Sequence, residues 1–252
     1  MSHIQQIDAA KLMANVFSFS PNHSVLEIGS YDVNGTVRSI FNSPDYIGVD
    51  LTSGPTVDLV LSGHEIDFSR KFDFVLSFEC FEHNPYWEAT LEKMIDHVEG
   101  NGYLFLTCAS LGRIEHGTAR TNPDHSPGTS SIGWDYYQNL SKNDVEVLLK
   151  ANPKVTDYIV CTQNNTYDLY VVCCVGGRIQ DVVREELIND LKLLESINWT
   201  FYNVINQLWY LPVRCLFRLI GDTPLYQSIA TKYFKFTKGI FSNMITRNAL
   251  RK

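Results

Sequence analysis

Histidines next to acidic residues occur in two stretches of this sequence, and each could remove a proton from a hydroxyl group. His83 follows Glu82 directly after an apolar run, and His116 follows Glu115 in a polar stretch. Histidine suits general-base chemistry because its ordinary pKa lies close to neutral pH. His83 is therefore the first candidate for a catalytic base and His116 the second. For His83 the alternative is a purely structural role in shaping its loop.

His125, which follows Asp124, is a third candidate base. The acids Glu79, Glu82 and Asp124 could instead hold a divalent cation together with hydroxyl groups of a substrate. Their spacing alone does not establish such a site, and the six cysteines form no C-x-x-C pair that would indicate zinc. We therefore predict no bound metal.

A parallel sheet would position these residues at the ends of its strands. Residues 25–28 form an apolar run that ends at Gly29, and residues 46–50 form a second run that ends at Asp50. These runs predict two buried strands with a sharp turn after the first, followed by a helix over residues 36–41. A carboxylate about 20 residues past the glycine can accept hydrogen bonds from both hydroxyls of a ribose.

Two ligands carry a ribose that such a unit could bind, a dinucleotide and S-adenosylmethionine. A dinucleotide site needs glycines where this chain has Tyr31 and Val33, whose side chains would obstruct a pyrophosphate. S-adenosylmethionine carries no phosphate, and Glu27 could face the positive end of its methionine. The pattern favours S-adenosylmethionine and disfavours a nicotinamide-dependent dehydrogenase.

Four segments resemble, in order and spacing, the motifs of the class I S-adenosylmethionine-dependent methyltransferases. They are residues 25–29, 46–50, 72–83 and 102–107, and the likeness extends over residues 20–175. The resemblance implies an α/β fold with a doubly wound, seven-stranded, mostly parallel sheet whose last strand is antiparallel. It also implies S-adenosylmethionine as cofactor and S-adenosylhomocysteine as product. The first loop departs from the family, which usually carries two or three glycines close together there.

The resemblance also implies which residues contact the cofactor. Gly63 and His64 follow a third predicted strand at residues 57–61, where the family places contacts to adenine, although His64 reads equally well as a solvated loop residue. The expected cofactor residues are Glu27, Gly29, Ser30, Asp50, Leu51, Gly63, His64, Ser77, Phe78 and Glu79.

Residues 109–134 form a long polar stretch without apolar periodicity, and such a loop in a compact domain is usually functional. We interpret it as the substrate loop, with Arg113, Arg120, Asp124 and His125 as substrate-binding residues. The two arginines could pair with phosphate groups.

This polar loop favours an O-methyltransferase acting on a small polyhydroxylated acceptor, in particular a nucleotide-activated sugar or a glycan. Residues 115–121 also resemble methyltransferases of bacterial surface-polysaccharide (capsule) biosynthesis. The alternatives are another small-molecule or lipid-linked acceptor, and a non-catalytic scaffold that binds S-adenosylmethionine.

The 252 residues carry a net charge of −7, which argues against nucleic acid as a partner. We predict a methyltransferase domain at residues 1–177 and a helical appendage at residues 178–252. Residues 211–252 alone carry +7, because they contain eight lysines and arginines and one acid. We favour packing within the chain or in a homodimer for this tail, with an anionic membrane surface as the alternative.

Other features place the protein in a reducing cytoplasm, or at the inner face of the membrane if the tail binds there. The sequence shows no signal peptide and no apolar run long enough to span a membrane. Apolar spacing over residues 4–19 predicts a helix, which we expect to lie as a lid over the cofactor.

Overall fold

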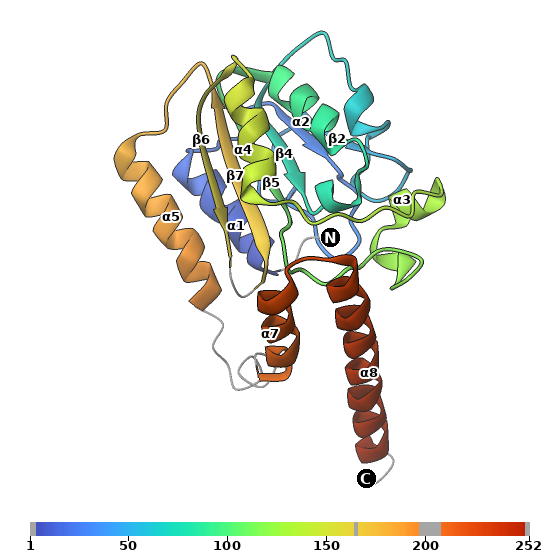
Figure 1. Ribbon diagram of the computed structural model, residues 1–252. Coiled ribbons are helices and arrows are strands. Elements are labelled where there is room, and N and C mark those ends of the chain that lie inside the picture. Colours follow the sequence, from blue (N-terminus) through green and yellow to red (C-terminus); the bar gives the residue numbers. More distant parts are fainter. Residues whose placement is uncertain (1–3, 164–165, 197–207, 250–252) are drawn as a thin grey trace. The chain divides into compact units, whose positions relative to one another are not determined.

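The computed structural model describes residues 4–163, 166–196 and 208–249 (Figure 1). The chain divides into two compact units, residues 1–198 and 199–252. The sequence puts the domain boundary at residue 177. The first compact unit extends further because helix α5 (Asp181–Ser196) buries Leu187 and Leu191 in its core.

The first unit is built on a sheet of seven strands in the order β3-β2-β1-β4-β5-β7-β6. All neighbouring strands are parallel except β7, which is antiparallel to β5 and to β6. This topology confirms the predicted fold class. The strands are β1 (Val25–Ile28), β2 (Tyr46–Asp50), β3 (Leu59–Val60), β4 (Phe72–Phe78), β5 (Val98–Ala109), β6 (Val155–Thr162) and β7 (Asp168–Val175).

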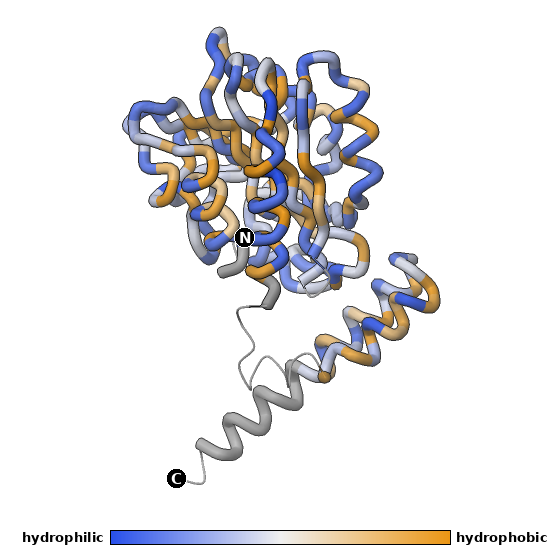
Figure 2. Tube along the Cα trace, turned by 90° about the vertical axis from the view of Figure 1, so that its left-hand side faces the viewer, coloured by the Kyte–Doolittle hydropathy of each residue, from blue (hydrophilic) through white to orange (hydrophobic). Residues whose placement is uncertain are grey.

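The central strands are apolar along most of their length because helices cover both faces of the sheet. Every residue of β1 and of β7 is buried. One face packs against α2 (Trp87–Asp96) and α4 (Lys142–Ala151). The other face packs against α1 (Ile4–Val16) and α5, which lie side by side (Figure 1). Hydrophobic residues accordingly concentrate along the strands (Figure 2).

Two helix predictions need correction. Residues 29–45 contain turns and no helix, although hydrogen bonds from the N–H groups of Ile40 and Phe41 to the Val37 carbonyl form a single helix-like turn. Helix α1 exists, but none of its described residues lines the pocket introduced below. It packs through Ala9, Ala10 and the side chain of Met13 against the sheet, so its apolar face serves the core.

Helix α4 is capped at its N-terminus. Ser141 caps α4 by accepting a hydrogen bond from the N–H of Asp144, whose carboxylate accepts one from the N–H of Ser141. Strands β6 and β7 form the antiparallel hairpin that closes the sheet at one edge.

The second unit contains α7 (Leu211–Ile220) and α8 (Pro224–Ala249). Pro212 lies in the first turn of α7, and Gly221 ends that helix with a φ of 65°. Tyr233 of α8 donates a hydrogen bond to the Trp209 carbonyl at 2.7 Å. The sequence spaces apolar residues at helical intervals from Val183 to Leu208. This segment is helical as far as Ser196, and residues 197–207 lie outside the described part of the chain. Among the described helices, none has the length and apolar character needed to cross a membrane.

Candidate active site

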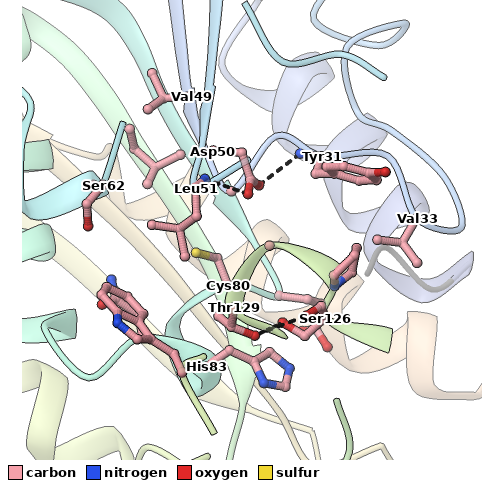
Figure 3. A pocket seen from close by; sticks show the side chains of 18 of the residues that line it. Tyr31, Val33, Val49, Asp50, Leu51, Ser62, Cys80, His83, Ser126 and Thr129 are labelled. Atoms are coloured by element: carbon pink, nitrogen blue, oxygen red, sulfur yellow. Dashed lines mark hydrogen bonds between the residues drawn. The ribbon is translucent and has the colours of Figure 1, made fainter. Parts of the chain in front are cut away.

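A pocket opens at the carboxyl ends of β1, β2 and β4 (Figure 3). Its volume is about 640 Å³, open solvent at its mouth included. Loops from several strands converge at this edge of a parallel sheet, so residues distant in sequence meet there. The lining residues are Ile28, Gly29, Tyr31, Val33, Val49, Asp50, Leu51, Leu61, Ser62, Gly63, Glu79, Cys80, His83, Asn84, His125, Ser126, Pro127, Gly128, Thr129 and Trp134.

Asp50 is held in a fixed orientation on the pocket wall. Its Oδ2 accepts a hydrogen bond from the N–H of Tyr31 at 3.0 Å, and its Oδ1 accepts one from the N–H of Leu51 at 2.7 Å (Figure 3). Burial raises the pKa of Asp50, and these N–H donors oppose the rise. A carboxylate fixed in this way has acceptor capacity left for ligand hydroxyls.

Gly29 brings the loop after β1 into direct contact with the loop after β4. Its φ is 80°, a conformation that side-chain-bearing residues rarely adopt. A β-carbon at this position would lie 2.6 Å from Cβ of Cys80, closer than two carbon atoms can approach. Position 29 therefore requires glycine for two independent reasons.

The predicted substrate loop folds back over Asp50. It contains a short 3₁₀ turn (Pro123–His125) and the five-residue helix α3 (Pro127–Ser131). A β-carbon at Gly128 would lie 2.7 Å from Oδ1 of Asp50, so the backbone of α3 lies directly against the carboxylate. The hydroxyls of Ser126 and Thr129 hydrogen-bond to each other at 2.7 Å on the pocket wall (Figure 3).

The structure brings together about half of the expected cofactor residues. Gly29, Asp50, Leu51, Gly63 and Glu79 line the pocket. The others lie outside its lining. Those residues are Glu27, Ser30, His64, Ser77 and Phe78.

These five residues have other surroundings. Ser30, Ser77 and Phe78 are buried. His64 stacks on Tyr86 with ring centroids 4.2 Å apart, and its Nδ1 lies 2.7 Å from the hydroxyl of Ser62. The predicted cofactor contacts remain predictions.

Glu27 is a buried carboxyl group with a protein partner. Its Oε2 accepts a hydrogen bond from the hydroxyl of Tyr46 at 2.6 Å. Burial raises the pKa of Glu27 to about 7, and the Tyr46 hydrogen bond only partly offsets this rise. Glu27 thus changes its charge near neutral pH inside the fold.

His83 lies at the end of the pocket opposite Asp50, in a 3₁₀ turn (Phe81–His83) that follows β4. Its ring centroid is 5.0 Å from that of His116 and 5.4 Å from that of Tyr137. A β-carbon at Gly117 would lie 2.6 Å from Cε1 of His83, so the loop that carries His116 packs directly on this ring. Burial lowers the pKa of His83 to about 3, which keeps the ring neutral at neutral pH.

His116 and Glu82 approach each other beside His83. Nε2 of His116 is 3.8 Å from Oε1 of Glu82, and Nδ1 of His116 is 3.2 Å from the Ile114 carbonyl oxygen. Burial raises the pKa of Glu82 and lowers that of His116. The two candidate bases predicted from the sequence therefore meet in one buried cluster, together with the acid that precedes His83.

Among the four expected substrate residues, His125 alone lines the pocket. Arg113 is half-buried and donates to Oδ1 of Asp168 at 3.2 Å and to the Thr166 carbonyl at 2.5 Å. Arg120 is exposed and pairs with Glu115 at 2.8 Å and with Asp135 at 3.1 Å. Asp124 is also exposed. Both arginines are thus engaged by carboxylates of the chain.

Several residues of the site escaped sequence reasoning. Trp134 lines the pocket, and Tyr137 contacts both histidine rings. The aromatic run at residues 134–137, which ends the polar loop, is the signal that could have indicated them. Asp168 lies opposite Ala109 across the β5–β7 ladder. Its place beside Arg113 follows from strand register and has no local signal.

Comparison with solved structures returns methyltransferases that share the fold at low identity. N-methyltransferase NodS from Bradyrhizobium japonicum WM9, in complex with S-adenosylhomocysteine, is 12% identical with a TM-score of 0.44, covering 70% of this chain and 90% of NodS. The 1,6-didemethyltoxoflavin N1-methyltransferase from Burkholderia thailandensis is 16% identical with a TM-score of 0.47, covering 68% and 78% of the two chains. The plantazolicin methyltransferase BpumL is 13% identical with a TM-score of 0.47, covering 69% and 84%.

The family comparison covers more than half of the chain. A search among curated proteins finds no match. A family profile described as a methyltransferase domain matches residues 2–162, which include strands β1 to β5, the pocket and the histidine cluster. The chain therefore belongs to the methyltransferase-domain family, and it is a methyltransferase that uses S-adenosylmethionine.

Proposed function

We propose that this enzyme transfers the methyl group of S-adenosylmethionine to a hydroxyl of a small polyhydroxylated acceptor. A nucleotide-activated sugar or a glycan of bacterial surface-polysaccharide biosynthesis is the acceptor class that we favour. The observation that supports the proposal most is the cluster of buried Glu82 and His83 with half-buried His116. His83 of this cluster lines one end of the pocket, and Asp50 lines the other. Transfer to oxygen requires removal of a proton, and this cluster contains groups that can accept one.

The pocket residues fit the cofactor. Asp50 would accept hydrogen bonds from the ribose hydroxyls, since its carboxylate is already oriented by two backbone N–H groups. Gly63 and Leu61 would lie beside the adenine, in the loop after β3. Because α3 lies against Asp50, we expect residues 126–129 to shift when the ribose binds.

The cofactor supplies an electrophilic methyl group on a positively charged sulfur. The acceptor oxygen attacks the methyl carbon while the carbon–sulfur bond breaks, so S-adenosylhomocysteine leaves and the hydroxyl proton must be taken up. We assign this proton to His83, with His116 as the alternative base. Both rings are neutral in their buried environment, which leaves a nitrogen lone pair available. A base with a pKa near 3 is weak, however, so the acceptor hydroxyl must be made more acidic before the transfer.

A polyhydroxylated acceptor matches the remaining walls of the pocket. Trp134 and Tyr31 offer aromatic faces, while His125, Ser126 and Thr129 offer hydrogen-bonding groups. All but Tyr31 belong to the stretch between β5 and α4, so this stretch would determine acceptor specificity. For the helices of residues 211–252 we keep packing within the chain or in a homodimer as the proposed role, ahead of contact with an anionic membrane surface.

Mass spectrometry of candidate acceptors tests the proposal. Sugar nucleotides, free glycans and lipid-linked glycans would be incubated with the enzyme and S-adenosylmethionine. We expect one class to gain the mass of a CH₂ unit with S-adenosylhomocysteine formed in equal amount. Methylation of an amine in preference to any hydroxyl would contradict the proposal.

A further inference from the structure

Three metal-ligating side chains converge beside the pocket. One ligand atom each from Glu82, His83 and His116 lies within 4.8 Å of the other two. Two atoms bound to the same cation at about 2.1 Å each would lie roughly 3 to 4.2 Å apart. The 3.8 Å between Nε2 of His116 and Oε1 of Glu82 already falls in that range. The backbone thus brings these three side chains almost to coordination distance.

The atoms that face one another lack hydrogen-bond partners among the residues that the structure describes. This is true of both carboxylate oxygens of Glu82, of Nδ1 of His83 and of Nε2 of His116. Glu82 is fully buried and His83 is 5% exposed. Buried polar groups normally have a partner, because losing water without replacing its hydrogen bonds is costly. Several such atoms in one place therefore indicate a missing common partner.

The hydrogen bonds on the outer side of the histidines fix which nitrogen faces inward. Nδ1 of His116 lies 3.2 Å from the Ile114 carbonyl, which can only accept, so Nδ1 carries the proton. Nε2 then presents a lone pair toward Glu82. His83 makes a hydrogen bond with the backbone of Tyr136, and its Nδ1 is the atom without a partner. Histidines that bind a metal are typically held by such carbonyl contacts through their second nitrogen.

The charge around the cluster is unbalanced. The carboxyl groups of Glu79, Glu82 and Asp168 lie close enough to interact electrostatically, and Arg113 is the cation that interacts with all three. A divalent cation would compensate the two negative charges that Arg113 leaves over when all three are ionised.

We propose that Glu82, His83 and His116 bind a divalent transition-metal cation at the wall of the pocket. Two imidazoles and one carboxylate suit manganese, iron, cobalt or zinc better than magnesium or calcium, and they leave coordination positions open. Because His83 also lines the pocket, the open positions would face the acceptor. The cation's role, which rests on the proposed function, is to bind the acceptor hydroxyl and make it more acidic. With the cation bound, the inward-facing lone pair of each histidine is engaged by the metal. The hydroxyl on the cation would then lose its proton to water, so the metal takes the place of His83 in activating the acceptor. The proposal thereby revises the expectation of a metal-free site.

Binding of Mn²⁺ to the full-length protein tests the site without any assay of activity. Mn²⁺ is the suitable probe because thiolates, which six free cysteines could supply, prefer softer metals. A titration followed by electron paramagnetic resonance is expected to show one bound Mn²⁺ per chain. His116→Gln and Glu82→Gln should each weaken this binding at least about tenfold. His23→Gln, which alters a histidine in the turn before β1, is the matched control and should bind as the wild type does.

A second measurement needs no variant and so does not depend on whether a variant folds. Electron spin-echo spectra of Mn²⁺ bound to the wild type should show couplings to two imidazole nitrogens. The proposal would be overturned if the wild type bound no Mn²⁺ or if its spectra showed no nitrogen couplings. It would also be overturned if folded His116→Gln bound Mn²⁺ as tightly as the wild type does. Mn²⁺ binding without methylation of any hydroxyl would leave the metal site standing and refute the proposed acceptor. Methylation of a hydroxyl without Mn²⁺ binding would leave the proposed acceptor class standing and refute the metal site.

Discussion

The backbone at Gly128 lies so close to Asp50 that a β-carbon there would be 2.7 Å from Oδ1 of the carboxylate. Asp50 is the residue we expect to bind the cofactor ribose, and Gly128 belongs to the loop we expect to bind the acceptor. We therefore expect the two substrates to be coupled through this contact, because a ribose bound at Asp50 would displace part of the acceptor loop.

Cofactor binding should alter the dynamics of this loop. We expect added S-adenosylmethionine to change the hydrogen-exchange rates of the amides at residues 128–131, while the amides of β7 keep theirs. Hydrogen exchange followed by mass spectrometry provides the measurement. If the amides of residues 128–131 exchange at the same rates with and without saturating S-adenosylmethionine, the ribose binds elsewhere.

The contribution of Asp50 can be measured directly. Asp50→Ala should weaken S-adenosylmethionine binding by about 1.5–3 kcal/mol, the range for hydrogen bonds to a charged group. Asp45→Ala is a matched control, because Asp45 pairs with Arg70 on the surface and lies outside the pocket lining. Calorimetry that finds equal affinities for wild type and a folded Asp50→Ala would disprove the assignment.

The proposed base has its own signature. His83→Gln should lower kcat by ~10²–10⁴, the usual effect of removing a positioned base. Affinity for S-adenosylmethionine should stay nearly constant, since the ribose contact is at the opposite end of the pocket. If His116 is the base, the same pattern is expected for His116→Gln. Near-normal kcat in both variants would exclude the histidine cluster from the chemistry.

Stability should depend on pH through Glu27. Its folded-state pKa is about 7 and its ordinary value is 4.5, so between these values the folded protein holds a proton that the unfolded chain has lost. The contribution of Glu27 to the free energy of unfolding is therefore greatest below pH 4.5. It declines as the pH rises to about 7, by about 3 kcal/mol in total. Glu27→Gln should remove this decline, because glutamine does not titrate.

Denaturant unfolding from pH 5 to 8 provides the comparison. The wild type should lose more stability over this interval than Glu27→Gln does. Parallel pH curves for the two proteins would mean that burial does not raise the pKa of Glu27.

Local signals in the sequence were sufficient for part of this architecture. The apolar runs that end at Gly29 and Asp50 predicted β1 and β2, because a buried parallel strand must be apolar and its turn must admit a positive φ. The helix predicted at residues 36–41 does not form beyond a single turn. Three apolar residues among six suggested it, yet Val37 and Phe41 are buried just as well by a turn.

The site was less accessible to sequence reasoning because its parts come together only in three dimensions. His83 and His116 were each selected for their chemistry, but nothing in the sequence indicated that their rings would lie 5.0 Å apart. Arg113 was expected to bind phosphate, and the register of β5 with β7 instead places it against Asp168. Glu27 was expected at the cofactor, and its partner is the hydroxyl of Tyr46.

Transfer of a deuterated methyl group tests the central claim most directly. The enzyme would be incubated with S-adenosylmethionine labelled in its methyl group and with the acceptor found by the mass-spectrometric screen, and the product would be analysed by nuclear magnetic resonance. We predict that the label resides on an oxygen of the acceptor and that His83→Gln abolishes the signal while still binding the cofactor. Label on nitrogen or carbon, or undiminished transfer by His83→Gln, would contradict an O-methyltransferase that works through this cluster.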